Sequence, residues 1–184
     1  GEYNLPIGDP VEPGVLNVMG LLPADAPRNR LGLARWLTAR SHPVVARVLI
    51  NRVWQRVFGN GLVRSPEDFG LQGQYPTHPR LLDWLAVEWQ DRDWDLKDMI
   101  RMMVNSRTFR QSSQWRSEVD DPENRWLARG PSHRLDAEVL RDLGLWAGGI
   151  LDPHMGGEGV KPYQPSGLWL ALAHPASNTK QYVE

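Results

Sequence analysis

The residues of this chain that could carry out acid–base chemistry gather in one loop and at the helix start that follows it. Glu67 and Asp68 lie in the loop, and His78 precedes Pro79 at a predicted helix start. Two carboxylates can act as general acid and general base across a glycosidic bond. Asp68 could equally cap the next turn or meet a nearby arginine. We prefer this structural interpretation, so the sequence singles out no catalytic residue.

A second set of polar residues shows helical spacing. Arg47 precedes Asn51 by four positions, and Arg134 precedes Glu138 by four on a later predicted helix. Polar groups that approach a core must be paired, so we expect a buried Arg–Glu–Asn network that joins the two helices. The alternative is a polar pocket at the helix junction. The candidates for this network or pocket are Arg47, Asn51, Arg52, Asp68, His78, Arg134 and Glu138.

Other chemistries lack their motifs in the sequence. The chain has no cysteine, which removes thiolate zinc sites and the C-x-x-C-H attachment of haem. No pair of histidines has the H-x-x-x-H spacing of a helix-borne metal site, and no G-x-S-x-G is present. We therefore predict no metal site and no cofactor in this segment.

Nine tryptophans are many for 184 residues. Exposed tryptophan suggests carbohydrate stacking or a protein interface, whereas tryptophan on an apolar helix face suggests a core. Those that we expect in the core are Trp36, Trp54, Trp84 and Trp146. Those in polar or loop surroundings, which we take as candidate interface residues, are Trp94, Trp115 and Trp169.

Charge is unevenly distributed along the chain, although the formal net charge is only −1. Residues 28–64 contain eight arginines and no acid, whereas residues 65–98 contain eight acids, two arginines and one lysine. A basic patch can bind nucleic acid, but adjacent segments of opposite charge more often pair with each other. We expect internal pairing and no nucleic-acid partner. No apolar run approaches the roughly 20 residues that span a bilayer, so we expect no membrane span.

Apolar residues recur at helical spacing in most of the chain, which predicts an all-α fold: an irregular multi-helix single domain with long ordered loops. Proline and glycine dominate residues 1–27, which we expect to form an extended lead-in arm before a helical domain at 28–184. Helix starts are indicated by Ser41 with Pro43, by Thr77 with Pro79, by Asp95 and by Ser132. The predicted helices are 30–40, 43–58, 79–90, 96–104, 133–147 and a short one at 166–173.

Several blocks of the sequence resemble one family. The block NRVWQRVFGNGLVRSPEDFG, followed by PTHPRLLDWLA, is similar to a PSD-type domain of unknown function that is abundant in planctomycetes. There it forms the C-terminal domain of large proteins with planctomycete cytochrome C-like domains. Matching blocks, in order, are GEYNLPIGDPVEPGV, NRLGLARWLT, MVNSRTFRQSS, DPENRWL, RLDAEVLRDL and MGGEGVKPYQPSGLW. Phe109 replaces the family's tyrosine, and relatives continue beyond SNTKQYVE, so we expect the domain to be truncated at its C-terminus.

The resemblance implies extracytoplasmic placement in a multidomain bacterial protein whose haem lies in other domains. It implies no established activity. Our leading hypothesis is a non-catalytic helical module for binding or scaffolding in a larger exported protein. Its expected partners are other domains of the same polypeptide, haem-containing ones included. Carbohydrate is a further candidate ligand. One alternative is an enzyme domain that acts on polysaccharide or sulfated glycan with acids such as Asp68. A second is a docking domain for haem-bearing partner domains.

Overall fold

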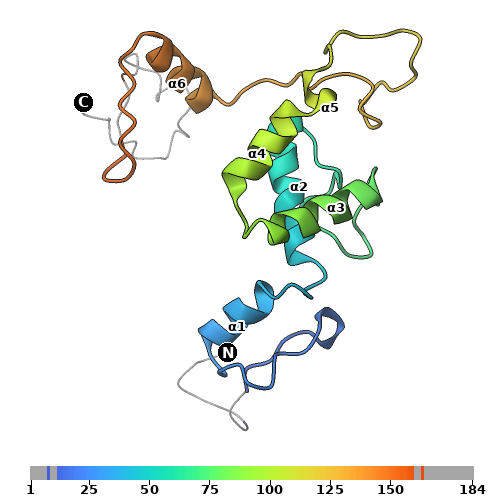
Figure 1. The fold of residues 1–184 in the computed structure, drawn as a ribbon, viewed down its shortest axis with the longest axis vertical. Coiled ribbons are helices and arrows are strands. Elements are labelled where there is room, and N and C mark those ends of the chain that lie inside the picture. The colour runs from blue at the N-terminus through green and yellow to red at the C-terminus, as the bar shows by residue number, and fades with distance from the viewer. Residues whose placement is uncertain (1–7, 9–11, 160–162, 164–184) are drawn as a thin grey trace, which may run out of the picture. The chain divides into compact units, whose positions relative to one another are not determined.

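The computed structural model describes residues 8, 12–159 and 163 (Figure 1). All regular secondary structure in this part of the chain is helical, so the predicted all-α fold class is confirmed. The helices are η1 (Asn17–Met19), α1 (Arg30–Leu37), α2 (Val45–Phe58), α3 (Pro79–Asp91), α4 (Leu96–Asn105), α5 (Arg107–Arg110) and α6 (Ala137–Ala147). The chain forms two compact units: unit 1 is Gly1–Arg134 and unit 2 is Leu135–Glu184. The predicted boundary between an arm at 1–27 and a domain at 28–184 stays a prediction.

Helix starts in unit 1 follow from local capping. Asp95 caps α4 as predicted, because its carboxylate accepts a hydrogen bond from the backbone N–H of Asp98 at 3.0 Å. Pro79 occupies the first turn of α3, where a missing N–H costs nothing. Helix α2 begins at Val45, two residues later than predicted. There the ring Nδ1 of His42 accepts hydrogen bonds from the backbone N–H groups of Val44 and Val45, which is the capping role expected of Ser41.

The core of unit 1 is centred on α2, which packs against both α3 and α4 (Figure 1). One face of α2 is buried at helical spacing by Ala46, Ile50, Trp54 and Phe58. Trp54 and Phe58 stack with ring centroids 3.9 Å apart, and Phe109 contacts Phe58 edge-on at 5.7 Å. The remaining buried hydrophobic residues are Leu62, Val63, Leu82, Leu85, Ala86, Trp89, Met99 and Met103.

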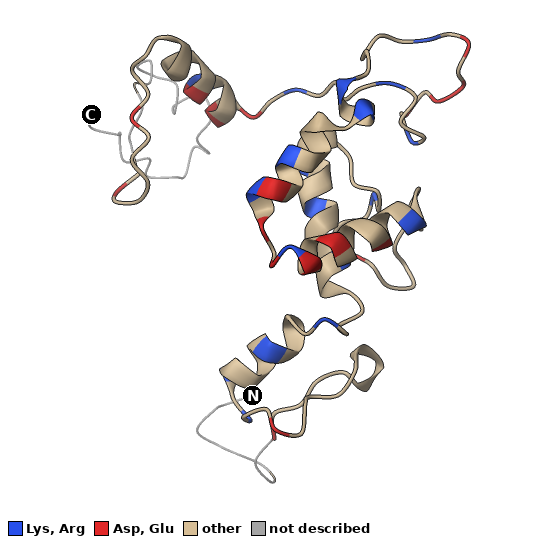
Figure 2. Cartoon of the chain, viewed as in Figure 1, with Lys and Arg blue, Asp and Glu red and all other residues tan. Residues whose placement is uncertain are grey.

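Ion pairs join the arginine-rich and acid-rich segments of unit 1, as the charge pattern predicts. Arg47 on α2 contacts Asp83 on α3 at 2.6 Å, and Arg40 pairs with Asp91. Figure 2 shows basic (blue) and acidic (red) positions on the neighbouring helices of unit 1. All four side chains are substantially exposed, so each pair contributes at most about 1 kcal/mol. These pairs orient neighbouring elements while the apolar core supplies most of the stability.

The expectations for Ser132, Trp84 and Trp146 need correction. Helix α6 begins at Ala137, preceded by Asp136, so Ser132 caps nothing there. Two of the predicted core tryptophans are exposed: Trp84 on α3 by 50% and Trp146 on α6 by 70%. Trp84 lies on the side of α3 opposite its buried residues, and α6 buries none of its residues. The helix predicted at 166–173 lies outside the described residues. Among the residues that the structure describes, no helix is long and apolar enough to cross a membrane.

Candidate functional site

The first loop, residues 59–78, joins α2 to α3. Its conformation is stabilised by hydrogen bonds from the side chain of Asn51. This side chain is fully buried. Its Nδ2 donates a hydrogen bond to the carbonyl oxygen of Val63 at 2.9 Å, and the N–H of Val63 donates to Asn51 Oδ1 at 2.9 Å. A Cβ on Gly61 would lie 2.4 Å from the Val63 carbonyl oxygen and 2.7 Å from Asn51 Nδ2, so only glycine fits there. Asn51 therefore serves the loop's conformation.

Asp68 has a structural role in the same loop. Its Oδ1 accepts a hydrogen bond from the backbone N–H of Gly70 at 2.7 Å, which is an Asx turn. The hydroxyl of Ser65 donates to the Asp68 carbonyl oxygen at 2.9 Å and accepts from the backbone N–H of Gln74 at 2.8 Å. The N–H of Thr77 donates to the carbonyl oxygen of Leu62 at 2.9 Å and closes the loop. The carboxylate that the sequence offered for catalysis thus caps a turn.

The second loop, residues 111–130, is built around a buried charge. Asp121 is only 3% exposed. Its carboxylate accepts hydrogen bonds from the backbone N–H groups of Arg125 at 2.7 Å, Trp126 at 2.9 Å and Ala128 at 3.4 Å. The guanidinium of Arg129 donates to the Asp121 carbonyl oxygen at 2.8 Å. Burial alone raises the pKa of Asp121, but the three N–H groups and the Arg129 charge outweigh it and hold this pKa below its usual value.

The backbone of the second loop turns sharply on both sides of Trp126. Asn124 has φ +52° and Leu127 has φ +58°, the left-handed region that β-carbon contacts disfavour. Asn124 and Arg129 stabilise the turn by a reciprocal pair of bonds: the N–H of Arg129 donates to Asn124 Oδ1 at 3.1 Å, and Asn124 Nδ2 donates to the Arg129 carbonyl oxygen at 3.0 Å. Leu127 packs against the core, while Trp126 is 64% exposed. The strained turn thus separates two apolar neighbours, one inward and one outward.

The second loop is tied to the rest of unit 1 at several points. Arg64 donates to the carbonyl oxygen of Glu123 at 2.7 Å and pairs with its carboxylate at 3.2 Å. Gln111 Nε2 donates to the carbonyl oxygen of Leu127 at 2.8 Å. The indole of Trp126 meets the imidazole of His78 edge-on, with centroids 5.8 Å apart and planes at 70°. The two loops therefore form one ordered surface at the start of α3.

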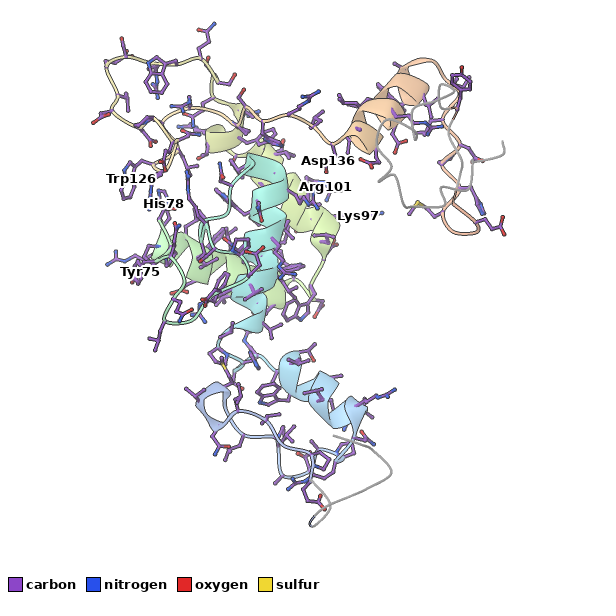
Figure 3. All side chains as sticks on the ribbon, turned by 180° about the vertical axis from the view of Figure 1, so that it is seen from behind. Tyr75, His78, Lys97, Arg101, Trp126 and Asp136 are labelled. Carbon is purple, nitrogen blue, oxygen red and sulfur yellow. The ribbon has the colours of Figure 1, made fainter. Side chains whose placement is uncertain are left out.

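This surface displays an aromatic ridge, which we define as Tyr75, His78 and Trp126. Figure 3 shows the three side chains in order along one edge of unit 1. Tyr75 is 80% exposed, and His78 is partly buried with its Nδ1 2.9 Å from the hydroxyl of Thr77. The ridge combines rings from two loops that lie far apart in sequence.

A small pocket lies between α2 and the two loops. Its volume is about 30 Å³, which holds one or two water molecules and no sugar ring. Glu67 and Asp68 do not line it. The lining residues are Trp54, Phe58, Asn60, Gly61, Leu62, Arg64, Thr77, Asn124, Arg125 and Leu127.

The residues predicted as a polar network or pocket fall into three groups. His78 belongs to the ridge, and Asn51 and Asp68 hold the first loop. Arg47 pairs with Asp83, and Asn51 bonds to the backbone of Val63. These partners differ from those expected in an Arg–Glu–Asn network. The remaining three, all exposed, are Arg52, Arg134 and Glu138. The described residues contain no cluster of His, Asp or Glu suited to a metal ion.

The candidate interface tryptophans also have different environments. Trp94 is partly buried against Trp89, with centroids 5.2 Å apart. Trp115 is exposed, and the guanidinium of Arg129 lies 4.7 Å from its ring centroid. Trp169 lies outside the described residues. Sequence reasoning missed Tyr75 and Trp126, although the block DPENRWL, with acids and an asparagine around one tryptophan, is typical of a turn that exposes it.

Comparison with known proteins gives a family. The model of the family PSD1, described as a protein of unknown function (DUF1553), matches residues 29–183. No curated protein and no solved structure matches the chain. Because the match spans most of the 184 residues, the chain belongs to the PSD1 family of proteins of unknown function.

Proposed function

We propose that this chain is a non-catalytic binding module and that the aromatic ridge is its contact surface. One observation supports the proposal. The turn that carries exposed Trp126 beside His78 is stabilised by the buried Asp121, and it contains two left-handed residues, Asn124 and Leu127. Left-handed non-glycine residues cost roughly 1–3 kcal/mol each, and such strain concentrates at functional sites. Aromatic side chains are also the residues that most often dominate binding energy.

The chemistry of the acids favours binding over catalysis. Asp68 caps Gly70, and the carboxylate of Asp121 is occupied by three backbone N–H groups. A general acid or base needs access to the proton that it transfers. The enzyme alternative therefore has less support than a binding role.

The resemblance to domains of large exported bacterial proteins supports two further parts of the proposal. The module acts outside the cytoplasm, and its neighbours on the same polypeptide, haem-bearing domains among them, are partners that it scaffolds. We propose that any haem belongs to those neighbours and that this segment carries no cofactor.

Sedimentation with the insoluble envelope fraction of the source organism tests the binding role. The 184-residue chain is mixed with that fraction, and the protein left in solution is measured. We expect retention of the wild-type chain and a loss of affinity of at least about tenfold in Trp126→Ala, because removal of an aromatic anchor costs more than about 1.4 kcal/mol. Trp126→Phe, which keeps a ring, should retain part of the affinity.

Two exposed tryptophans outside the ridge provide matched controls. The exposed fractions of Trp84, 50%, and Trp146, 70%, bracket that of Trp126. Trp84→Ala and Trp146→Ala should be retained like the wild type. Equal retention of Trp126→Ala and wild type, or no retention of the wild type, would overturn the proposal. Release of reducing ends from polysaccharide that disappears in Asp68→Asn would show an enzyme instead.

A further inference from the structure

We infer that the ligand of the aromatic ridge is an acidic saccharide chain, one that carries carboxylate or sulfate groups. This inference rests on the proposed binding function and names the class of ligand. It follows from three features of the described residues: the exposed rings, the polar groups in the same loops and two arginines close to the rings in the sequence.

The rings provide flat apolar faces open to solvent. Trp126 and Tyr75 expose most of their surface, whereas His78 supports Trp126 from one side. The C–H face of a pyranose is also flat and apolar, and its hydroxyl groups remain free to form hydrogen bonds at its edges. Stacking of such a face on tryptophan or tyrosine buries apolar area while the polar edges of the sugar stay satisfied.

Polar groups accompany the ridge residues in the two loops. Exposed Asn60 and partly buried Thr77 line the small pocket, and Gln74 precedes Tyr75, whereas Leu71 is the one large aliphatic side chain that the first loop exposes. A specific protein–protein contact needs about 800 Å² of surface per partner with an apolar centre. Rings set among amide and hydroxyl groups fit a saccharide better.

Two arginines that are close to the ridge residues in the sequence lack ion-pair partners among the described residues. Arg125 precedes Trp126 and lines the pocket, and Arg80 lies in the first turn of α3, two residues after His78. Most arginines near this surface are engaged: Arg64 pairs with Glu123, and Arg129 holds the second loop. Guanidinium groups bind carboxylate and sulfate oxygens with two parallel hydrogen bonds. The unpaired arginines therefore favour an anionic ligand.

The second loop prepares this surface before the ligand arrives. Trp126 is fixed through its backbone N–H on Asp121, and the loop is closed by the bond from the Gly130 N–H to the Ser112 carbonyl oxygen at 2.9 Å. Binding then orders few side chains, which removes an entropic cost of association.

Two treatments of the envelope fraction test the class of ligand. Periodate cleaves vicinal diols and so destroys most saccharide chains, whereas a broad-specificity protease removes protein. We expect periodate, and not protease, to abolish sedimentation of the 184-residue chain. Loss of sedimentation after protease alone would show a protein partner and overturn this inference while leaving the binding role intact.

Titration with defined probes tests the charge. The probes are oligogalacturonate for carboxylate, chondroitin sulfate oligosaccharide for sulfate, cellohexaose as the neutral control and oligothymidylate as a nucleic-acid control. We expect at least one acidic saccharide to bind about tenfold or more tightly than cellohexaose, with affinity falling as salt increases. Preference for one acidic probe identifies the charged group.

Variants separate the two components of this binding. Arg80→Gln with Arg125→Gln should reduce the acidic preference at least about fivefold, whereas Trp126→Ala should weaken acidic and neutral probes alike. Arg52 is an exposed arginine on α2 without an ion pair in the described chain, so Arg52→Gln is the matched control. It should leave the affinity for every probe unchanged. Circular dichroism of every variant checks the fold. An acidic-saccharide ligand would be refuted by equal affinity for cellohexaose and the acidic probes, by tighter binding of oligothymidylate, or by no binding of any saccharide. In each case the binding role would still be supported if the envelope fraction retains the wild-type chain and not Trp126→Ala.

Discussion

The buried carboxylate of Asp121 accepts a hydrogen bond from the backbone N–H of Trp126 at 2.9 Å, so a charge inside unit 1 holds the backbone of an exposed tryptophan in place. A buried carboxylate is unfavourable unless several donors satisfy it. Here the donors are backbone groups of the very turn that carries the indole. The stability of the second loop and the position of Trp126 therefore depend on the same atoms.

Asp121→Asn should destabilise unit 1 by about 1–3 kcal/mol although the two side chains have nearly the same shape. The amide NH₂ group of asparagine would face backbone N–H donors that need an acceptor, and one of these donors would lose its partner. Urea unfolding measures the loss. Hydrogen exchange should quicken first at the amides of Arg125, Trp126 and Ala128, and unchanged exchange at these three would contradict the role of Asp121.

Acid should loosen the second loop before it unfolds the helices. The pKa of Asp121 is held below the usual value of about 3.9 for an aspartate carboxyl. The folded state therefore binds this proton less tightly than the unfolded state, so the contribution of Asp121 is complete above about pH 4 and is lost as pH falls through its lowered pKa.

Hydrogen exchange or proteolysis of the second loop as a function of pH measures this loss. Asp121→Asn removes the titrating group and should flatten the dependence below pH 4. An equal pH dependence in the variant would assign the effect to other carboxyls.

Replacement of glycine should have opposite consequences at two positions. Gly61→Ala forces a Cβ to within 2.4 Å of the Val63 carbonyl oxygen and against the Asn51 amide, so we expect a loss of about 1–3 kcal/mol. Gly144 in α6 has nothing within 4 Å of a built Cβ, and Gly144→Ala should raise helix content through better propensity. Urea unfolding and circular dichroism measure both. A neutral Gly61→Ala would contradict the close fit between the first loop and Asn51.

The contact between Arg64 and Glu123 should govern how firmly the second loop is anchored. Arg64→Ala removes two interactions with Glu123, one of them to its backbone carbonyl. Cleavage within residues 111–130 by a protease should then become several-fold faster, because local opening of the loop costs less free energy. Arg52→Ala serves as the control and should be cleaved at the wild-type rate.

The helices of this protein could be predicted because their signals are local. Asp95 and Pro79 mark helix starts within a few residues, and apolar spacing identified the buried face of α2. Trp84 shows the limit of such spacing: it fits an apolar pattern, but the helix already buries Leu82, Leu85, Ala86 and Trp89 on the side that faces α2.

The ridge could not be predicted because it depends on contacts between distant segments. His78 was identified as a candidate from the sequence, but its ring partner is Trp126, which belongs to the second loop and lies far from it in the sequence. The capping role of Asp68 likewise depends on a hydrogen bond from the backbone N–H of Gly70. Spacing alone carries neither piece of information.

Hydroxyl-radical footprinting of the wild-type chain measures whether the aromatic ridge is the contact surface. Oxidation of each aromatic residue is measured by mass spectrometry with and without the envelope fraction, and Trp84 and Trp146 serve as internal references for radical dose. We expect oxidation of Trp126 and Tyr75 to fall at least about threefold relative to the references when the fraction is present. Equal oxidation of Trp126 in the bound and free states would contradict this expectation.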